Sequence, residues 1–203
     1  MSILAQGGLL ILSYLMGGIP TGYLVVRRMK GIDIREHGSG NPGTANVYRI
    51  AGAMAGAVTL VIDAAKGFVP VLLARRFFAD HPIFVILCGA AAIIGHDWTV
   101  FLGGRGGKGV ATSAGVFAAL IPLPMALGLA VFIAGVRLSG HISVGSMAAA
   151  VVLPVLSLLL KEPGAYSMAA LASSLLIFYK HIPNIRRLRE ARELPVHPQT
   201  RQT

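Results

Sequence analysis

The segment VATSAGVFAALIPLPMALGLAVFIAGV, residues 110–136, decides how often the chain crosses a membrane. It contains no charged residue, but Pro122 and Pro124 stand in its middle. Proline has no amide hydrogen and clashes with the preceding helical turn, so it disfavours a continuous helix. A single span needs about 20 apolar residues. The segment therefore predicts two short antiparallel spans rather than one.

Further apolar blocks flank this segment and bring the prediction to about seven transmembrane helices, in an all-α, polytopic membrane protein. These blocks cover residues 3–26, 53–78, 83–101, 142–160 and 165–179. With seven spans, most lysines and arginines fall on one side, which the positive-inside rule makes cytoplasmic. The N-terminus is then outside and the C-terminus cytoplasmic. We expect one integral-membrane domain over residues 1–203, with 193–203 as a flexible tail.

The overall composition supports the same class. Of the 203 residues, 55% are hydrophobic and 13% are charged, which is not typical of a soluble domain. The net charge is +10, but the cations lie in loops between apolar blocks and have few aromatic neighbours. Membrane topology and anionic ligands therefore explain them better than nucleic acid. Cys88 is the only cysteine, so a disulfide within the chain is excluded.

The loop GGRGGKG, residues 103–109, has the features of a phosphate-binding site. Glycines allow successive backbone N–H groups to point at one anion, and Arg105 and Lys108 add positive charge. A helix beginning at Val110 would also favour an anion at its N-terminus. The spacing is not that of a P-loop, because Leu102 and Gly109 stand where a glycine and a hydroxyl residue are needed. The alternative is a flexible loop whose cations fix topology.

A second polar segment, GSGNPGTAN over residues 38–46, is followed by Arg49. Its hydroxyl and amide side chains can hydrogen-bond a polar ligand, and arginine can bind a phosphate through two hydrogen bonds. The same residue types also form ordinary turns and helix caps. We favour a functional role for Ser39, Asn46 and Arg49, and a structural one for Asn41 and Pro42.

A third polar cluster follows the last apolar block. His181 and Asn184 are three residues apart and share one face of a helix. Further polar residues, predicted to lie on the same side of the membrane, are His141, Ser143, Arg187, Glu190 and Glu193. A histidine at a membrane interface is more often a capping residue than a catalyst. The glycine-rich loops expected on the same side favour a functional site.

Charged residues also occur inside the second apolar block. Asp63 and Lys66 are three apart, and ionisable groups at membrane depth are costly unless they pair or face a polar cavity. We expect a structural ion pair beneath the site. His96-Asp97 precedes the glycine loop and is suited either to the floor of the site or to a helix end.

Several common catalytic patterns are missing from the sequence. No histidine is followed by aspartate five positions later, and no G-x-S-x-G nucleophile motif occurs. The acidic residues form no cluster that would hold Mg²⁺. The polar loops therefore suit phosphate binding and acyl chemistry without a metal.

The three polar segments resemble the motifs of the bacterial acyl-phosphate:glycerol-3-phosphate acyltransferases of the PlsY type, and the similarity extends over nearly the whole chain. It rests on Gly38-Ser39-Gly40-Asn41 through Asn46 and Arg49, on Gly95-His96 with residues 106–112, and on His181, Asn184, Arg187, Leu188 and Glu193. Any one of the motifs alone would be weak, but all three in this order are specific.

The sequence departs from that family at three places. Thr44-Ala45 stands where the family more often has Ala-Thr, Ile182 replaces an arginine, and Ala191 replaces a glycine of the third motif. The first change is conservative. The last leaves the placement of Glu193 open.

The resemblance implies transfer of a fatty acyl group from acyl phosphate to the 1-hydroxyl of glycerol 3-phosphate, which yields lysophosphatidic acid for phospholipid synthesis. The resemblance implies that acyl-CoA is not the donor, that no acyl-enzyme forms, and that no metal or cofactor takes part. Catalytic roles are expected for Lys108, Arg49, His181 and Ser39. Substrate binding is expected for Gly40, Asn41, Asn46, Gly106, Gly107, Gly109, Ser143, Asn184 and Glu193.

The expected mechanism is neutralisation and positioning of two phosphates by Lys108, Arg49 and loop N–H groups. Either His181 or a substrate phosphate would accept the hydroxyl proton. We expect the protein in the bacterial inner membrane, among lipids, with its site facing the cytoplasm. A transporter of an organic phosphate and an assembly subunit are the alternatives. Transporters, however, usually show internal repeats and midplane sites. Acyl-chain preference and oligomeric state stay open.

Overall fold

The computed structural model describes residues 2–196, and every regular element in that part of the chain is helical. The all-α prediction is confirmed. The elements are α1 (Ile3–Gly18), α2 (Thr21–Lys30), η1 (Ile34–Glu36), α3 (Thr44–Phe77), α4 (Pro82–Asp97), η2 (Val100–Leu102), α5 (Val110–Leu120), α6 (Pro122–Ser139), α7 (Ile142–Leu159) and α8 (Gly164–Arg189).

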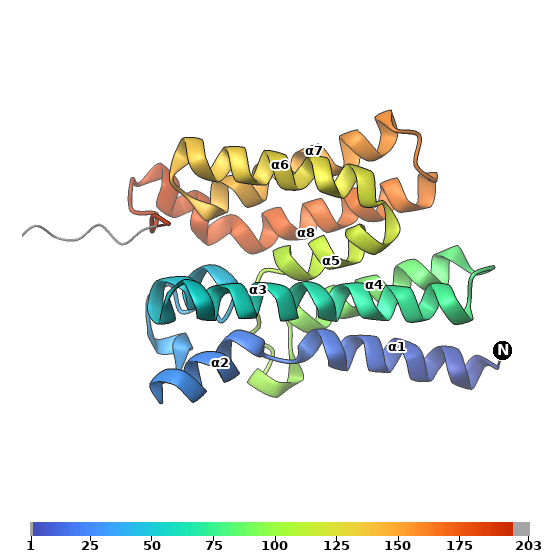
Figure 1. The fold of residues 1–203 in the computed structure, drawn as a ribbon, viewed down its shortest axis with the longest axis horizontal. Coiled ribbons are helices and arrows are strands. Elements are labelled where there is room, and N and C mark those ends of the chain that lie inside the picture. The colour runs from blue at the N-terminus through green and yellow to red at the C-terminus, as the bar shows by residue number, and fades with distance from the viewer. Residues whose placement is uncertain (1, 197–203) are drawn as a thin grey trace, which may run out of the picture.

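The helices form two groups with α5 between them (Figure 1). Helices α1 to α4 lie on one side and α6 to α8 on the other. The main pairs are α1 with α4, α3 with α5, α6 with α7, and α7 with α8. Small residues allow these close approaches: a Cβ on Gly17 would lie 2.0 Å from the Ala92 carbonyl oxygen, and one on Gly115 would lie 1.9 Å from that of Ala64. Such contacts are typical of helices packed in a membrane, where burial of apolar surface drives little association.

The prolines separate helices where the sequence predicted a separation, and also at one place where it did not. Helix α5 ends at Leu120 and α6 begins at Pro122, so the central block is two helices, as expected. The first block was predicted as one span over residues 3–26, and the segment Ile3–Lys30 is suited to be one span, but its helix is interrupted. Its helix ends at Gly18, and α2 begins only after Pro20. Helix α3 starts nine residues before the predicted 53 and contains a kink at Gly52, which has φ +87°.

By length and composition, five segments among residues 2–196 are suited to cross a membrane. They are Ile3–Lys30, Thr44–Phe77, Pro82–Leu102, Pro122–Ser139 and Ile142–Leu159. Helix α5 is apolar but has only 11 residues, and α8 carries the basic residues of the third motif. Helices therefore occupy all the predicted blocks, while the count of seven spans and the side of each terminus stay predictions.

Candidate functional site

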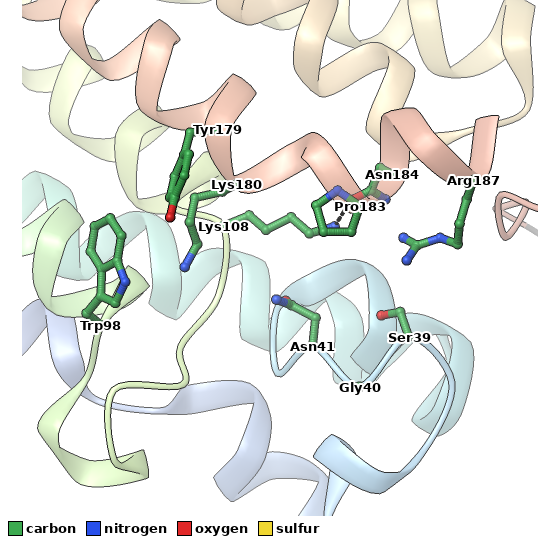
Figure 2. A pocket seen from close by; sticks show the side chains of 10 residues that line it. All are labelled: Ser39, Gly40, Asn41, Trp98, Lys108, Tyr179, Lys180, Pro183, Asn184 and Arg187. Carbon is green, nitrogen blue, oxygen red and sulfur yellow. Dashed lines mark hydrogen bonds between the residues drawn. The ribbon is translucent and has the colours of Figure 1, made fainter. Parts of the chain in front are cut away.

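A cleft of about 360 Å³ opens between the first polar loop, the glycine loop and the end of α8 (Figure 2). Three segments far apart in the sequence therefore meet, as the sequence predicted. The lining residues are Ser39, Gly40, Asn41, Trp98, Lys108, Tyr179, Lys180, Pro183, Asn184 and Arg187. Five of the predicted site residues are among them: Ser39, Gly40, Asn41, Lys108 and Asn184.

Lys108 provides the positive charge in the middle of this cleft. Its ammonium donates a hydrogen bond to Oδ1 of Asn184. Within residues 2–196 no carboxylate forms an ion pair with it. Burial lowers the pKa of Lys108 to about 8, and the negative charge of Glu193 opposes this shift. At neutral pH the side chain is therefore mostly protonated, and its charge is available to an anion.

Four of the seven amides in the glycine loop are used within the protein, and binding of a phosphate by the remaining N–H groups stays a prediction. The amides of Gly103, Gly104 and Arg105 donate to carbonyl oxygens of residues 99–102, and that of Gly107 donates to the His96 carbonyl. The glycines also permit close packing. A Cβ on Gly107 would lie 2.0 Å from Nε2 of His96. The loop thus rests on the end of α4 and presents the Lys108 side chain to the cleft.

The first polar loop is held in shape by Asn46. This buried side chain accepts a hydrogen bond from the Ser39 amide (3.0 Å) and donates to the carbonyls of Ile34 and His37. It therefore positions the cleft-lining residues of the loop but does not line the cleft itself. Asn41 links the first loop to the glycine loop, because its Nδ2 donates to the Gly106 carbonyl.

Glu193 joins the third motif to α7. Its carboxylate accepts hydrogen bonds from Ser143 (2.8 Å), Asn184 and Arg187 (2.7 Å). Asn184 and Arg187 line the cleft, whereas Ser143 and Glu193 are buried behind them. The chain reaches this position through Ala191, which adopts φ +51°, a conformation that favours glycine. Glu193 therefore contacts two cleft-lining residues even though alanine occupies the turn, and its predicted contact with substrate stays a prediction.

Residues 194–196 make hydrogen bonds to distant parts of the chain, and the flexible tail expected over 193–203 stays a prediction. Arg49 donates from Nη2 to the Leu194 carbonyl and from Nε to the Pro195 carbonyl, both at 3.0 Å, and the Val196 amide donates to the Gly140 carbonyl. The rest of the predicted tail, residues 197–203, lies outside the described residues.

Arg49 and His181 do not line the cleft. Arg49 uses its Nε and Nη2 to donate to two carbonyls of the C-terminal segment. His181 is 3% exposed, and its Nδ1 lies 2.8 Å from the Ile177 carbonyl oxygen. These contacts indicate that Arg49 and His181 position the third motif. Their predicted contact with substrate stays a prediction, as it does for Gly106, Gly107 and Gly109, which also lie outside the lining.

Sequence reasoning missed one end of the cleft. Trp98, Tyr179, Lys180 and Pro183 line it, although no motif included them. The ammonium of Lys180 lies 4.6 Å from the centre of the Trp98 ring and donates a 3.0 Å hydrogen bond to the Asp97 carbonyl. The only sequence signal was position, since these residues adjoin His96-Asp97 and His181.

The predicted ion pair inside α3 is confirmed beneath the glycine loop. Nζ of Lys66 lies 2.9 Å from Oδ1 of Asp63 and donates at 2.8 Å to the Ile19 carbonyl, which is exposed by the break between α1 and α2. Thr99 donates to the Gly18 carbonyl at the same break. The pair and this hydroxyl together connect α3 and the start of the glycine loop to the first helix.

Comparisons with known proteins show the family to which the chain belongs. A sequence model of the family described as glycerol-3-phosphate acyltransferase matches residues 8–191. A glycerol-3-phosphate acyltransferase of Solidesulfovibrio magneticus is 45% identical over 190 residues, which is 94% of each chain. That of Geobacter sulfurreducens is also 45% identical, over 89% of this chain and 92% of its own.

Two solved structures share the fold over 94% of this chain and 95% of theirs. One is PlsY, an integral membrane glycerol 3-phosphate acyltransferase, in its glycerol 3-phosphate form, with a TM-score of 0.89 and 33% identity. The other is its lysophosphatidic acid form, with a TM-score of 0.87 and 32% identity. The chain described here therefore belongs to the glycerol-3-phosphate acyltransferase family of the PlsY type.

Proposed function

We propose that this protein transfers a fatty acyl group from acyl phosphate to the 1-hydroxyl of glycerol 3-phosphate and so forms lysophosphatidic acid. Membership of the family supports the acceptor and the reaction class. The observation that carries the proposal is the Lys108 ammonium, which stands in the cleft without a carboxylate partner among the described residues. A phosphate is the kind of group that such a site neutralises.

The cleft suits a reaction that needs positioning more than covalent help. Acyl phosphate is an activated anhydride whose leaving group is phosphate, so the acceptor hydroxyl can attack the carbonyl directly. The main obstacle is repulsion between two phosphates, which the cations of the cleft offset. His181 does not line the cleft, which favours a substrate phosphate rather than this histidine as the proton acceptor. No metal, cofactor or acyl-enzyme is part of the proposal.

We also place the site at the cytoplasmic face of the bacterial inner membrane. The support is the positive-inside rule, applied to the basic residues around the cleft. The organic-phosphate transporter considered from the sequence is not favoured, because the similar proteins are acyltransferases by name.

The test uses the purified protein in lipid with labelled glycerol 3-phosphate, no added metal, and either palmitoyl phosphate or palmitoyl-CoA. We expect lysophosphatidate from palmitoyl phosphate alone. Lys108→Ala should lose most of the activity, while Lys30→Ala, which removes an exposed cation from the end of α2, should retain it. Product from palmitoyl-CoA alone would disprove the proposed donor. Normal turnover by Lys108→Ala would disprove the role of the cleft.

A further inference from the structure

A second ammonium lies in the same cleft and has no assigned role. Lys180 follows Tyr179 on α8, and its side chain extends over the Trp98 ring (Figure 2). Its single hydrogen-bond partner among the described residues is a backbone carbonyl, that of Asp97. The Asp97 carboxylate is fully buried and makes no hydrogen bond to it. The direct contacts of the Lys180 ammonium are therefore a ring face and a carbonyl dipole, and the Asp97 carboxylate acts on its charge only through space.

The third cation of the cleft differs in this respect. Arg187 forms an ion pair with Glu193, so its charge is largely neutralised within the protein. Lys108 and Lys180 are thus the two cationic side chains that line the cleft without forming an ion pair in the described chain. Two ammonium groups that form no ion pair match a reaction that brings two phosphates together.

The two ends of the cleft differ in polarity, which indicates which phosphate belongs at which end. Figure 2 shows Ser39, Asn184 and Arg187 at one end, and Trp98 with Lys180 at the other. The first end offers hydroxyl, amide and guanidinium groups, as a small polar acceptor needs. The second end is aromatic.

The aromatic end continues onto an apolar surface. Tyr179 is 60% exposed, and it shares a face of α8 with other exposed apolar side chains at helical spacing. These residues are Leu171, Leu175 and Ile182. A fatty acyl chain attached to a phosphate held near Trp98 could lie along this stripe, in contact with lipid.

We propose, given the proposed function, that Lys180 binds the phosphate of the acyl donor at the aromatic end of the cleft, while Lys108 and Asn184 face the glycerol 3-phosphate. In the reaction, the acceptor hydroxyl oxygen forms a bond to the acyl carbon, and the bond from that carbon to the phosphate oxygen breaks. The bonding electrons leave with the phosphate, which also takes the hydroxyl proton and departs as hydrogen phosphate. Lys180 stabilises the negative charge that develops on this leaving group.

The test compares Lys180→Gln, Lys180→Arg and Lys30→Gln in lipid, with the KM of each substrate measured separately. We expect Lys180→Gln to raise the KM for palmitoyl phosphate about tenfold, as the loss of a charged hydrogen bond does, and to change the KM for glycerol 3-phosphate less than about twofold. Lys180→Arg should restore most of the donor affinity. Lys30→Gln removes a cation away from the cleft and should leave both values unchanged.

Inhibition by inorganic phosphate provides a second readout, because the product phosphate leaves from the same subsite. Its inhibition constant should rise in Lys180→Gln together with the donor KM. If Lys180→Gln raises both KM values equally, or neither, the assignment of Lys180 is wrong while the proposed function stands. If the wild-type protein uses palmitoyl-CoA and not palmitoyl phosphate, the proposed donor fails, and the Lys180 assignment fails with it.

Discussion

Gly107→Ala is the substitution that most directly tests how the glycine loop presents Lys108. The added Cβ would lie 2.0 Å from Nε2 of His96, where an ordinary contact begins at 3.4 Å, so loop and ring must separate by about 1.4 Å. His96 is buried, and the neighbouring residue of the loop is Lys108 itself. A displacement of about 1 Å in a positioning group can cost about 100-fold in rate. We expect kcat/KM for glycerol 3-phosphate to fall by about that factor.

The assay is steady-state acyl transfer in lipid, with thermal unfolding as a check of the fold. Gly103→Ala is the matched control, because its Cβ would meet nothing within 4 Å, although its φ of +61° costs stability. It should keep activity within about threefold of wild type, since no contact near the cleft changes. In a His96→Ala background the clash partner is absent, so the penalty of Gly107→Ala should shrink. Full activity of Gly107→Ala, or an unchanged penalty in that background, would refute the reasoning.

Three further predictions concern charge. Burial lowers the pKa of Lys108 to about 8, so the cation is lost above that pH. The kcat/KM for glycerol 3-phosphate should therefore fall about tenfold per pH unit above pH 8. A pH profile of Lys108→Arg should lack this decline, because arginine stays protonated. Glu193→Gln removes the carboxylate that holds Asn184 and Arg187 in place at the cleft. The KM for glycerol 3-phosphate should therefore rise about tenfold in the same assay. Asp63→Asn leaves the Lys66 ammonium buried without a counter-ion, which should lower the free energy of unfolding by about 3 kcal/mol. Denaturant titration would measure this loss. The double variant Asp63→Asn with Lys66→Met should recover part of the lost stability.

The helices were predictable where a local signal decides the conformation. Pro122 interrupts an apolar run and does begin a helix, and the three-residue spacing of Asp63 and Lys66 does produce a pair. The break after Gly18 was missed because apolar runs in membranes often contain glycine and proline. Its stability comes from groups distant in sequence, such as the Thr99 hydroxyl, which no local pattern reveals.

The site was predictable at the level of motifs but not of individual contacts. Residues such as Ser39 and Lys108 have no competing partner nearby in the sequence, and they do reach the cleft. Arg49 was expected beside a phosphate, yet its partners are carbonyls of Leu194 and Pro195, some 145 residues later. Lys180 was missed because its cleft environment exists only when α8 meets the end of α4.

The order in which Asp63 and Lys66 follow each other along α3 matters for the ion pair between them. The ammonium forms an ion pair with the Asp63 carboxylate and also donates to the Ile19 carbonyl, so it adds a second donor, beside the Thr21 amide, at the break between α1 and α2. Exchanging the two residues would keep opposite charges adjacent in α3. The carboxylate would then face a carbonyl oxygen, and two acceptors would meet without a hydrogen between them. The order of charge along α3 is therefore set by a backbone group more than forty residues earlier, and charge reversal is not a neutral exchange at this site.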